Sequence, residues 1–279
     1  MKKSTWLAGP YIVWMILFTV VPILIVAFFA FTTEGDDGSL QFTLQNFARS
    51  FDPVFLNSLL KSLWIALLTT IACLLLGYPL AMCLVRQSQK VRSLMVVLFM
   101  VPMWMNFLIR TYAWMAIFRG GDAGLLNSFL MSLGFEPVQF LYNDSAIILA
   151  MIYNYLPFMI LPIYNALEKI QKNTIEAAQD LGANSFKVFT TISLPLTVPG
   201  IISGITMVFM PAVTTFAIPK LVGGTDLMIG DMIEKQFLTN SDKNFGSALS
   251  IIMMILVLAS MLILNHFDKD NEAGGGGII

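Results

Sequence analysis

Six long apolar runs, each long enough to cross a lipid bilayer, make up most of this sequence. A span needs roughly 20 residues, and the runs cover residues 7–31, 59–85, 93–118, 145–167, 196–218 and 246–267. Only 12% of the residues are charged, whereas soluble domains typically contain about 25%. We therefore expect an all-α polytopic membrane protein with six transmembrane helices, because helices satisfy their own backbone hydrogen bonds in lipid.

The two ends of the chain carry separate expectations. The first run is longer than the roughly 7–15 residues of a signal-peptide core, so we expect an uncleaved span with a distortion at Pro22. Residues 1–267 then form one transmembrane domain, and residues 268–279, with four consecutive glycines, form a disordered tail. The short turn at 86–92 holds three basic residues and no acid, which favours a cytoplasmic turn and cytoplasmic termini.

A polar, helix-forming stretch at residues 173–199 interrupts the apolar runs. Asn173 can cap a first short helix, with Glu176 completing a capping box, and Gly182 can end it in the left-handed conformation. Asn184 or Ser185 can cap a second helix, which Pro195 is expected to stop. The stretch contains no His, no Cys and no carboxylates paired for acid–base work, so we interpret it as a docking element.

The same stretch carries a spaced motif: EAA, three residues, G, nine residues, I, one residue, LP. It consists of Glu176, Ala177, Ala178, Gly182, Ile192, Leu194 and Pro195. The motif resembles the cytoplasmic loop of inner-membrane subunits of ABC importers. The resemblance implies the type I ABC importer permease fold, with residues 173–195, Asp180 included, forming coupling helices that dock on an ATPase subunit. The residues alone also allow an amphipathic hairpin on the lipid headgroups, although the basic face of such a helix is missing.

The resemblance also implies the partners of the chain. They are two cytoplasmic ATPase subunits, a second homologous permease subunit, an external substrate-binding protein and the lipid bilayer. ATP and magnesium are expected on the ATPases, because this sequence has no GxxxxGK[ST] loop and thus no cofactor of its own. The chain is then a transport subunit and not an enzyme, and its net charge of −1 gives no reason to expect nucleic acid.

Other segments resemble one branch of this family, the permease subunits of spermidine/putrescine importers. They read LLGYPLA at 75–81, VPMW at 101–104, LIR at 108–110, LPF at 156–158, LPIY at 161–164 and LVGG at 221–224. The resemblance implies polyamine import across the bacterial inner membrane by alternating access. The alternatives are import of another solute, such as an anion or ferric iron, or a secondary transporter, which would need acids within its spans. A membrane-embedded enzyme would need a catalytic cluster, and the sequence contains none.

Arg110 is a charged residue inside the third apolar run. Such a charge costs at least about 2.5 kcal/mol unless it is paired or hydrated. In a continuous helix, Asn106, Phe107, Arg110 and Trp114 share an arc of roughly 100°. Arg110 either lines a translocation path or acts as a gating or structural charge, paired with an acid or with carbonyl groups of a neighbouring span or subunit.

Two further groups are candidates for contact with a cationic solute. Aromatic faces attract ammonium groups by about 0.5–2 kcal/mol, so the candidate substrate path comprises Trp104, Asn106, Tyr153, Asn154 and Tyr155. Ordinary packing is the alternative interpretation. An outer acidic loop comprises Asp226, Asp231 and Glu234, which either attract cations, hold a docking protein or simply face solvent.

Overall fold

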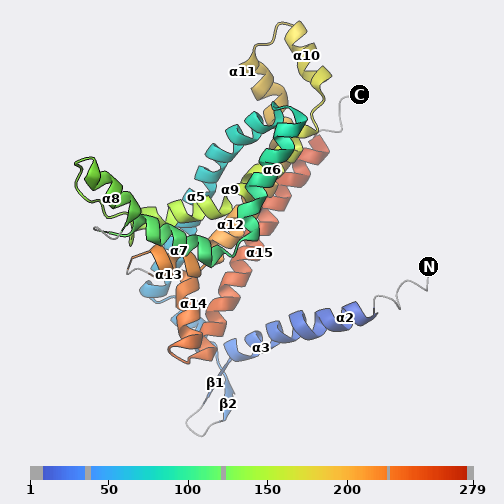
Figure 1. Ribbon diagram of the computed structural model, residues 1–279. Coiled ribbons are helices and arrows are strands. Elements are labelled where there is room, and N and C mark those ends of the chain that lie inside the picture. Colours follow the sequence, from blue (N-terminus) through green and yellow to red (C-terminus); the bar gives the residue numbers. More distant parts are fainter. Residues whose placement is uncertain (1–8, 35–38, 121–123, 225–226, 275–279) are drawn as a thin grey trace.

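The computed structural model describes residues 9–34, 39–120, 124–224 and 227–274, and these are largely helical (Figure 1). The centre of the molecule consists of four long helices: α5 (Pro53–Val85), α9 (Asp144–Glu168), α12 (Leu194–Thr214) and α15 (Lys243–Gly274). Helices α5, α9 and α12 pack against one another, and α15 lies beside α12. Five helical stretches among the described residues are long and apolar enough to cross a membrane, or six when one bent pair is counted as a single span.

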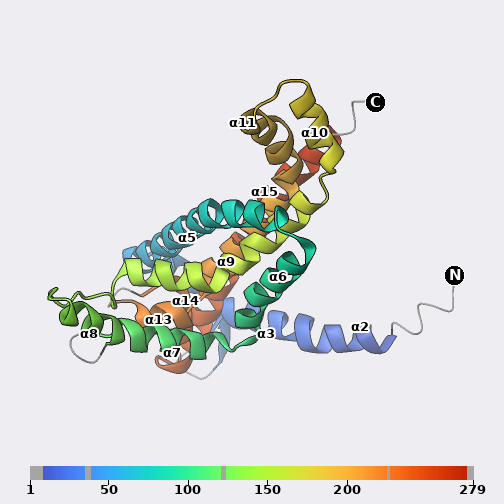
Figure 2. The ribbon, with the colours of Figure 1, turned by 45° about the horizontal axis from the view of Figure 1, so that its top comes forward.

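The first span leaves the bundle. It consists of α2 (Gly9–Met15), a π-helical turn at Ile16–Val20, and α3 (Val21–Ala30). Helix α3 packs against α15, whereas α2 projects away from the other helices (Figures 1 and 2). The distortion expected at Pro22 is present as the π-helical turn directly before α3, and Pro22 occupies the first turn of that helix.

The third apolar run does not form the single helix that the sequence predicts. It forms α6 (Gln89–Trp104) and α7 (Phe107–Phe118), whose axes are bent by 92° at the break between them. Asn106 stands outside α7 and caps it, because its side chain accepts a hydrogen bond from the backbone N–H of Leu108 at 2.9 Å. The predicted arc is therefore wrong for Asn106, although Phe107, Arg110 and Trp114 do lie on α7.

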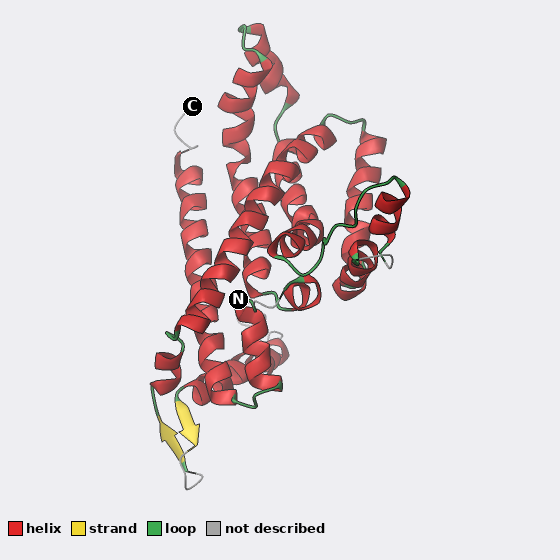
Figure 3. Ribbon diagram, turned by 90° about the vertical axis from the view of Figure 1, so that its left-hand side faces the viewer, coloured by secondary structure: helices red, strands yellow, loops and turns green. Residues whose placement is uncertain are grey.

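The end of the bundle shown at the bottom of Figures 1 and 3 is built from short elements. The strands of a small antiparallel hairpin are the exception to the all-α expectation, with Thr32 opposite Phe42. Two helices occupy the region after the fifth span, which the sequence predicts as a loop. Apart from the first span and the polar stretch, the short elements throughout the molecule are β1 (Thr32–Glu34), β2 (Leu40–Phe42), α4 (Gln45–Arg49), α8 (Leu125–Ser132), α13 (Ala217–Val222) and α14 (Ile229–Leu238).

The last helix is longer than its apolar run. Helix α15 continues to Gly274, whereas we expected helix only to residue 267 and a disordered tail from 268. Residues 268–273 contain neither proline nor glycine, so nothing in their chemistry stops a helix that has already formed. The remainder of the expected tail, 275–279, lies outside the described residues.

Candidate functional site

The polar stretch forms a helical hairpin that projects beyond the bundle (Figures 1 and 2). Its helices are α10 (Lys172–Asp180) and α11 (Ser185–Val188). Gly182 lies between them with a φ of +84°, as predicted. The N–H of Gly182 donates to the carbonyl of Gln179 at 2.8 Å, and that of Ala183 donates to Ala178 at 3.0 Å. These two bonds are a Schellman motif, which fixes the direction in which the chain leaves α10.

The predicted ends of the hairpin helices are right at one position and wrong at two. Asn184 caps α11 by accepting from the N–H of Lys187 at 2.8 Å, as expected. Asn173 is not a cap, because α10 already begins at Lys172. Pro195 does not stop the second helix, since α11 runs through a π-helical turn into α12. The π-helical turn Phe189–Ser193 lies just before the proline, and a local widening of this kind lets the helical path continue past a residue without an N–H.

Large apolar side chains on the hairpin are exposed, because no other described part of this chain packs over them. Leu181 is 90% exposed at the bend, and Phe186 on α11 is also exposed. Helix α10 has no buried residue, so Glu176 and Asp180 are exposed as well. Exposed large apolar groups beside polar ones are typical of a protein interaction site. The second hairpin helix is joined to the fifth span by the π-helical turn Phe189–Ser193, with no loop between them.

A cavity of about 320 Å³ lies where α7, α9, α12 and α13 meet. It contains three of the residues that the sequence singled out, Arg110, Asn154 and Tyr155. Its complete lining is Phe107, Arg110, Asn154, Tyr155, Phe158, Pro211, Thr215 and Ile218. Pro211, Thr215 and Ile218 were missed in the sequence because they belong to the fifth apolar run, and no local pattern joins them to Arg110. Phe158 was also missed, although it lies one helical turn from Asn154 on α9.

The polar groups of this cavity are incompletely satisfied. Arg110 is 8% exposed and Asn154 is 2% exposed. The Nε and Nη1 atoms of Arg110 and the Oδ1 of Asn154 have no hydrogen-bond partner in the described structure. The Nδ2 of Asn154 donates to the carbonyl of Ala150 at 2.8 Å. The ion pairs between described residues join other groups: Arg49–Asp242, Lys61–Asp144, Arg92–Glu168 and Lys220–Glu234.

The other candidate path residues lie elsewhere. Trp104 ends α6 and is 77% exposed. Asn106 is occupied in capping α7. Tyr153 packs its ring against Trp114, with the centroids 5.2 Å apart. The structure therefore gathers Arg110, Asn154 and Tyr155 in one cavity, and it does not bring Trp104, Asn106 or Tyr153 into its lining.

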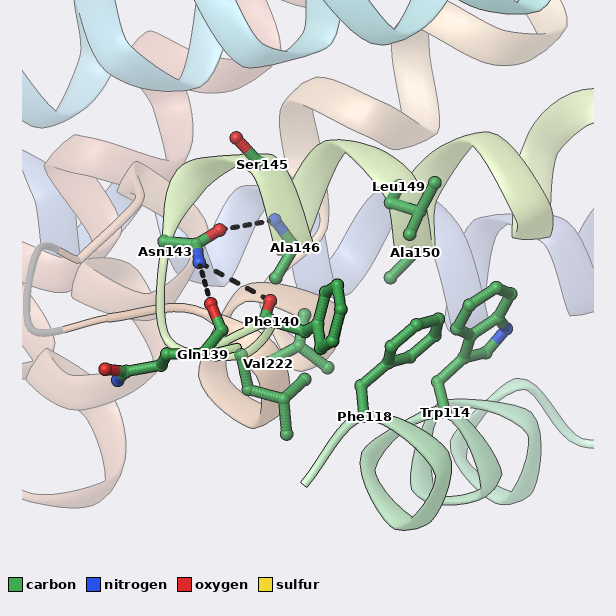
Figure 4. Close-up of a pocket in the computed structure, with 11 residues that line it drawn as sticks. Trp114, Phe118, Gln139, Phe140, Asn143, Ser145, Ala146, Leu149, Ala150 and Val222 are labelled. Carbon is green, nitrogen blue, oxygen red and sulfur yellow. Dashed lines mark hydrogen bonds between the residues drawn. The ribbon is translucent and has the colours of Figure 1, made fainter. Parts of the chain in front are cut away.

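A second pocket, of about 200 Å³, lies beside the start of α9 and is lined mainly by aromatic and aliphatic groups (Figure 4). Trp114 and Phe118 stack with centroids 4.6 Å apart, and Phe140 lies 5.5 Å from Phe118. The Asn143 side chain is already engaged, since its Oδ1 accepts from the N–H of Ala146 at 2.8 Å. This pocket therefore offers apolar contact and few polar groups.

The predicted outer acidic loop is not a freely exposed cation-attracting surface. Asp231 is 4% exposed, and its Oδ2 accepts from the N–H of Met228 at 3.2 Å. Burial raises the pKa of Asp231 to about 6. Glu234 binds the ammonium of Lys220 at 2.7 Å, and Asp226 lies outside the described residues. Within the described ranges, no group of His, Cys, Asp and Glu has the arrangement of a metal site.

Comparison of the sequence with known proteins gives a family match and several relatives. The chain matches the family described as binding-protein-dependent transport system inner membrane component over residues 73–272. It is 42% identical to the spermidine/putrescine transport system permease protein PotB of Escherichia coli (strain K12), with 90% of this chain and 92% of that protein covered. It is 30% identical to the putative 2-aminoethylphosphonate transport system permease protein PhnU of Salmonella typhimurium (strain LT2), covering 92% of this chain and 90% of that protein.

A solved structure agrees with the fold. The crystal structure of a bacterial ABC transporter involved in the import of the acidic polysaccharide alginate matches with a TM-score of 0.81. The sequence identity is 20%, and 96% of both chains is covered. The six-span fold with a coupling hairpin is thus the type I ABC importer permease fold. The family match covers well over half of the sequence, and this multi-pass membrane protein belongs to the binding-protein-dependent transport system inner membrane components.

Proposed function

We propose that this chain is a permease subunit of a bacterial inner-membrane importer for polyamines such as spermidine and putrescine. The observation that carries the proposal is the identity of 41–42% to PotB proteins over about nine tenths of the chain. The polyamine is delivered from outside by a substrate-binding protein. It then crosses between this subunit and a second, homologous permease by alternating access.

Two cytoplasmic ATPase subunits drive the cycle in this proposal, and they bind the ATP and magnesium. The exposed Leu181 and Phe186 at the tip of the α10–α11 hairpin support docking of one ATPase there. ATP binding draws the two ATPases together and moves the hairpin, and hydrolysis resets it. This chain itself carries out no hydrolysis.

The proposed orientation has both termini in the cytoplasm. It is supported by the position of the basic turn between α5 and α6, which lies at the same end of the bundle as the α10–α11 hairpin (Figure 1). An ion pair between Arg92 and Glu168, at 3.2 Å, joins this turn region to the end of α9 that leads into the hairpin. Basic residues in short cytoplasmic loops are the usual pattern of inner-membrane proteins.

A solute with an anionic group is the second candidate. Two observations favour it: the PhnU relative is named for 2-aminoethylphosphonate transport, and Arg110 places a buried positive charge in the central cavity. The lower identity of 30% makes this the weaker proposal.

Uptake by the assembled importer in proteoliposomes tests the proposal. Labelled spermidine and putrescine should accumulate when ATP is supplied on the ATPase side, and unlabelled 2-aminoethylphosphonate should not compete. Trp104→Ala and Tyr153→Ala should each lower uptake by about two- to thirtyfold if these rings attract the ammonium groups, the range that corresponds to a cation–π contact. An importer that ignores both polyamines, or that takes up the phosphonate, would overturn the assignment of the solute.

A further inference from the structure

The cavity at Arg110 contains a positive charge that the described part of the chain does not neutralise. Its guanidinium is buried, and two of its nitrogens have no acceptor. A guanidinium stays protonated in proteins, so Arg110 cannot avoid the cost of burial by losing a proton. The cavity beside it is about 320 Å³, which is large enough to receive a side-chain head group. An anionic group with oxygen acceptors that enters the cavity would both bond these nitrogens and neutralise the charge.

The walls of the cavity do not contribute such a group. Four of the lining residues are apolar rings or aliphatic side chains: Phe107, Phe158, Pro211 and Ile218. The hydroxyl of Tyr155 already donates to the carbonyl of Pro211 at 3.4 Å. The remaining polar lining is Asn154 and Thr215, which are uncharged. No carboxylate of the described chain lines the cavity.

We propose that a carboxylate side chain of the second permease subunit enters this cavity and pairs with Arg110. The inference rests on the proposed assembly of two permease subunits. A carboxylate matches the planar donor fork of a guanidinium and forms strong charge-assisted hydrogen bonds with it.

The depth of the cavity selects the second permease among the possible partners. Asn154 lies ten residues into α9, so it is about 15 Å from the start of that helix. A soluble receptor or ATPase that contacts an end of the bundle does not reach this depth without inserting a segment. In Figure 1 the α10–α11 hairpin and the strands lie at opposite ends of the molecule, and α13, which lines the cavity, lies between them. A neighbouring transmembrane chain reaches the cavity directly.

A tethered carboxylate is favoured over a free anion from solution. A free anion must lose its water and enter an apolar surrounding, and it dissociates again. A side chain of an assembled subunit is held at a high effective concentration. The cavity residue Phe107 is itself exposed, and the cavity residue Thr215 is followed in sequence by the exposed Phe216. Apolar groups that surround a buried polar contact exclude water from it when a partner covers them.

The test uses the complete importer with a tag on this chain, and it measures how much second permease copurifies. Arg110→Glu should lower that amount by at least about tenfold, which corresponds to about 1.4 kcal/mol, because two carboxylates then face each other. Arg110→Lys should retain most of the association. Arg119→Glu is the matched control, since Arg119 directly follows α7 and is exposed, and it should have no effect.

A second step identifies the partner residue. Each Asp and Glu in the spans of the second permease is replaced by Lys in the Arg110→Glu background, and one replacement should restore copurification. In a background without Cys73 and Cys83, Arg110→Cys should form a disulfide with a cysteine at that same partner position. The cross-link remains informative if Arg110→Glu fails to insert, because a cysteine carries no opposing charge.

Three results would overturn the inference. In the first, the second permease copurifies normally with the Arg110→Glu variant. In the second, only a further change within this chain restores copurification of that variant. In the third, the wild-type subunits separate when chloride or phosphate is removed, and no acid of the second permease is found whose replacement restores copurification. The last result would assign the cavity to a free anion. Copurification and cross-linking do not depend on the solute, so they can fail while polyamine uptake holds, and they can hold while polyamine uptake fails.

Discussion

Gly182 has a φ of +84° and would place a Cβ in open space, with no described atom within 4 Å. A substitution here is therefore opposed by the backbone conformation alone, at about 1–2 kcal/mol for an ordinary residue. Gly182→Val should weaken binding of the ATPase by about five- to thirtyfold if the bend orients the hairpin for docking. Gly182→Asn should retain more binding, because Asn tolerates the left-handed region.

Copurification of the ATPase and its polyamine-stimulated ATP hydrolysis measure this effect, with membrane insertion as the control. Equal coupling in Gly182→Val and wild type would show that the orientation of the bend does not matter.

Asp231 should make the stability of the α14 region depend on pH. Its pKa is about 6, above the usual value near 3.9, so the folded state retains a proton that the unfolded state loses between these values. The contribution of Asp231 to stability should therefore be fully present below about pH 4 and should be lost as pH rises through 6, by about 1–3 kcal/mol. Asp231→Asn retains an acceptor for the N–H of Met228 and removes the titration, so it should flatten this dependence.

The comparison of thermal unfolding at pH 5 and pH 8, wild type against Asp231→Asn, isolates this group from the other titrating residues. A dependence that stays the same in the variant would assign the pH effect elsewhere.

At the scale of the helices, the sequence predicts those features that are determined by residues close together in the chain. The long apolar runs identify the spans, and Gly182 and Asn184 identify the coupling hairpin, because these features act within a few residues. The break at Asn106 and the continuation of the helix through Pro195 were not predicted. Asn106 can either cap a new helix or continue an existing one, and Pro195 can either end a helix or follow a π-helical turn within it. The sequence does not decide between these conformations.

The cavity could not be predicted from the sequence either. Arg110 and Asn154 stood out as polar residues in apolar runs, but their shared environment depends on Pro211 and Thr215. Those residues reach the cavity only because α12 packs against α9 and ends beside α7 and α13. Long-range contacts of this kind leave no periodic pattern in one chain.

The contact between α9 and α12 depends on a glycine. A Cβ at Gly200 would lie 2.7 Å from the Cβ of Ala166 and from the backbone carbonyl oxygen of Pro162, which cannot move aside easily. A Cβ at Gly204 would lie 2.7 Å from the Sδ of Met159, the flexible part of a long side chain. Gly200→Ala should therefore destabilise the protein by about 1–3 kcal/mol, and Gly204→Ala by less.

Thermal unfolding of the two variants in the same detergent measures the difference. A lower melting temperature for Gly204→Ala than for Gly200→Ala would mean that Met159, and not the backbone of α9, limits the approach of the helices.

At the scale of the whole molecule, the two ends of the bundle differ in structure. The α10–α11 hairpin at one end exposes apolar groups in a polar setting, while the strands and α14 occupy the other end (Figure 1). The continuous helical stretch Ser185–Thr214 runs from the hairpin to the cavity that contains Pro211. One helical stretch without an intervening loop therefore joins the hairpin to the wall of the cavity at Pro211, which faces Arg110 on α7 across the cavity.

The orientation of these two ends can be measured with single cysteines. Cys73 is buried and Cys83 exposed, so both are first replaced by serine. Cysteines at Gln41 and Asn240, exposed at the end with the strands, should react with an impermeant maleimide added to intact cells whose outer membrane is permeable to it. Cysteines at Gln89 and Leu181, exposed near the coupling hairpin, should react only after the inner membrane is opened. Asn46 lies near the strands too, but it is not a suitable position for labelling because it is buried and donates to the carbonyl of Ala30 at 3.0 Å. The opposite labelling pattern would place the hairpin outside, where no cytoplasmic ATPase could bind it.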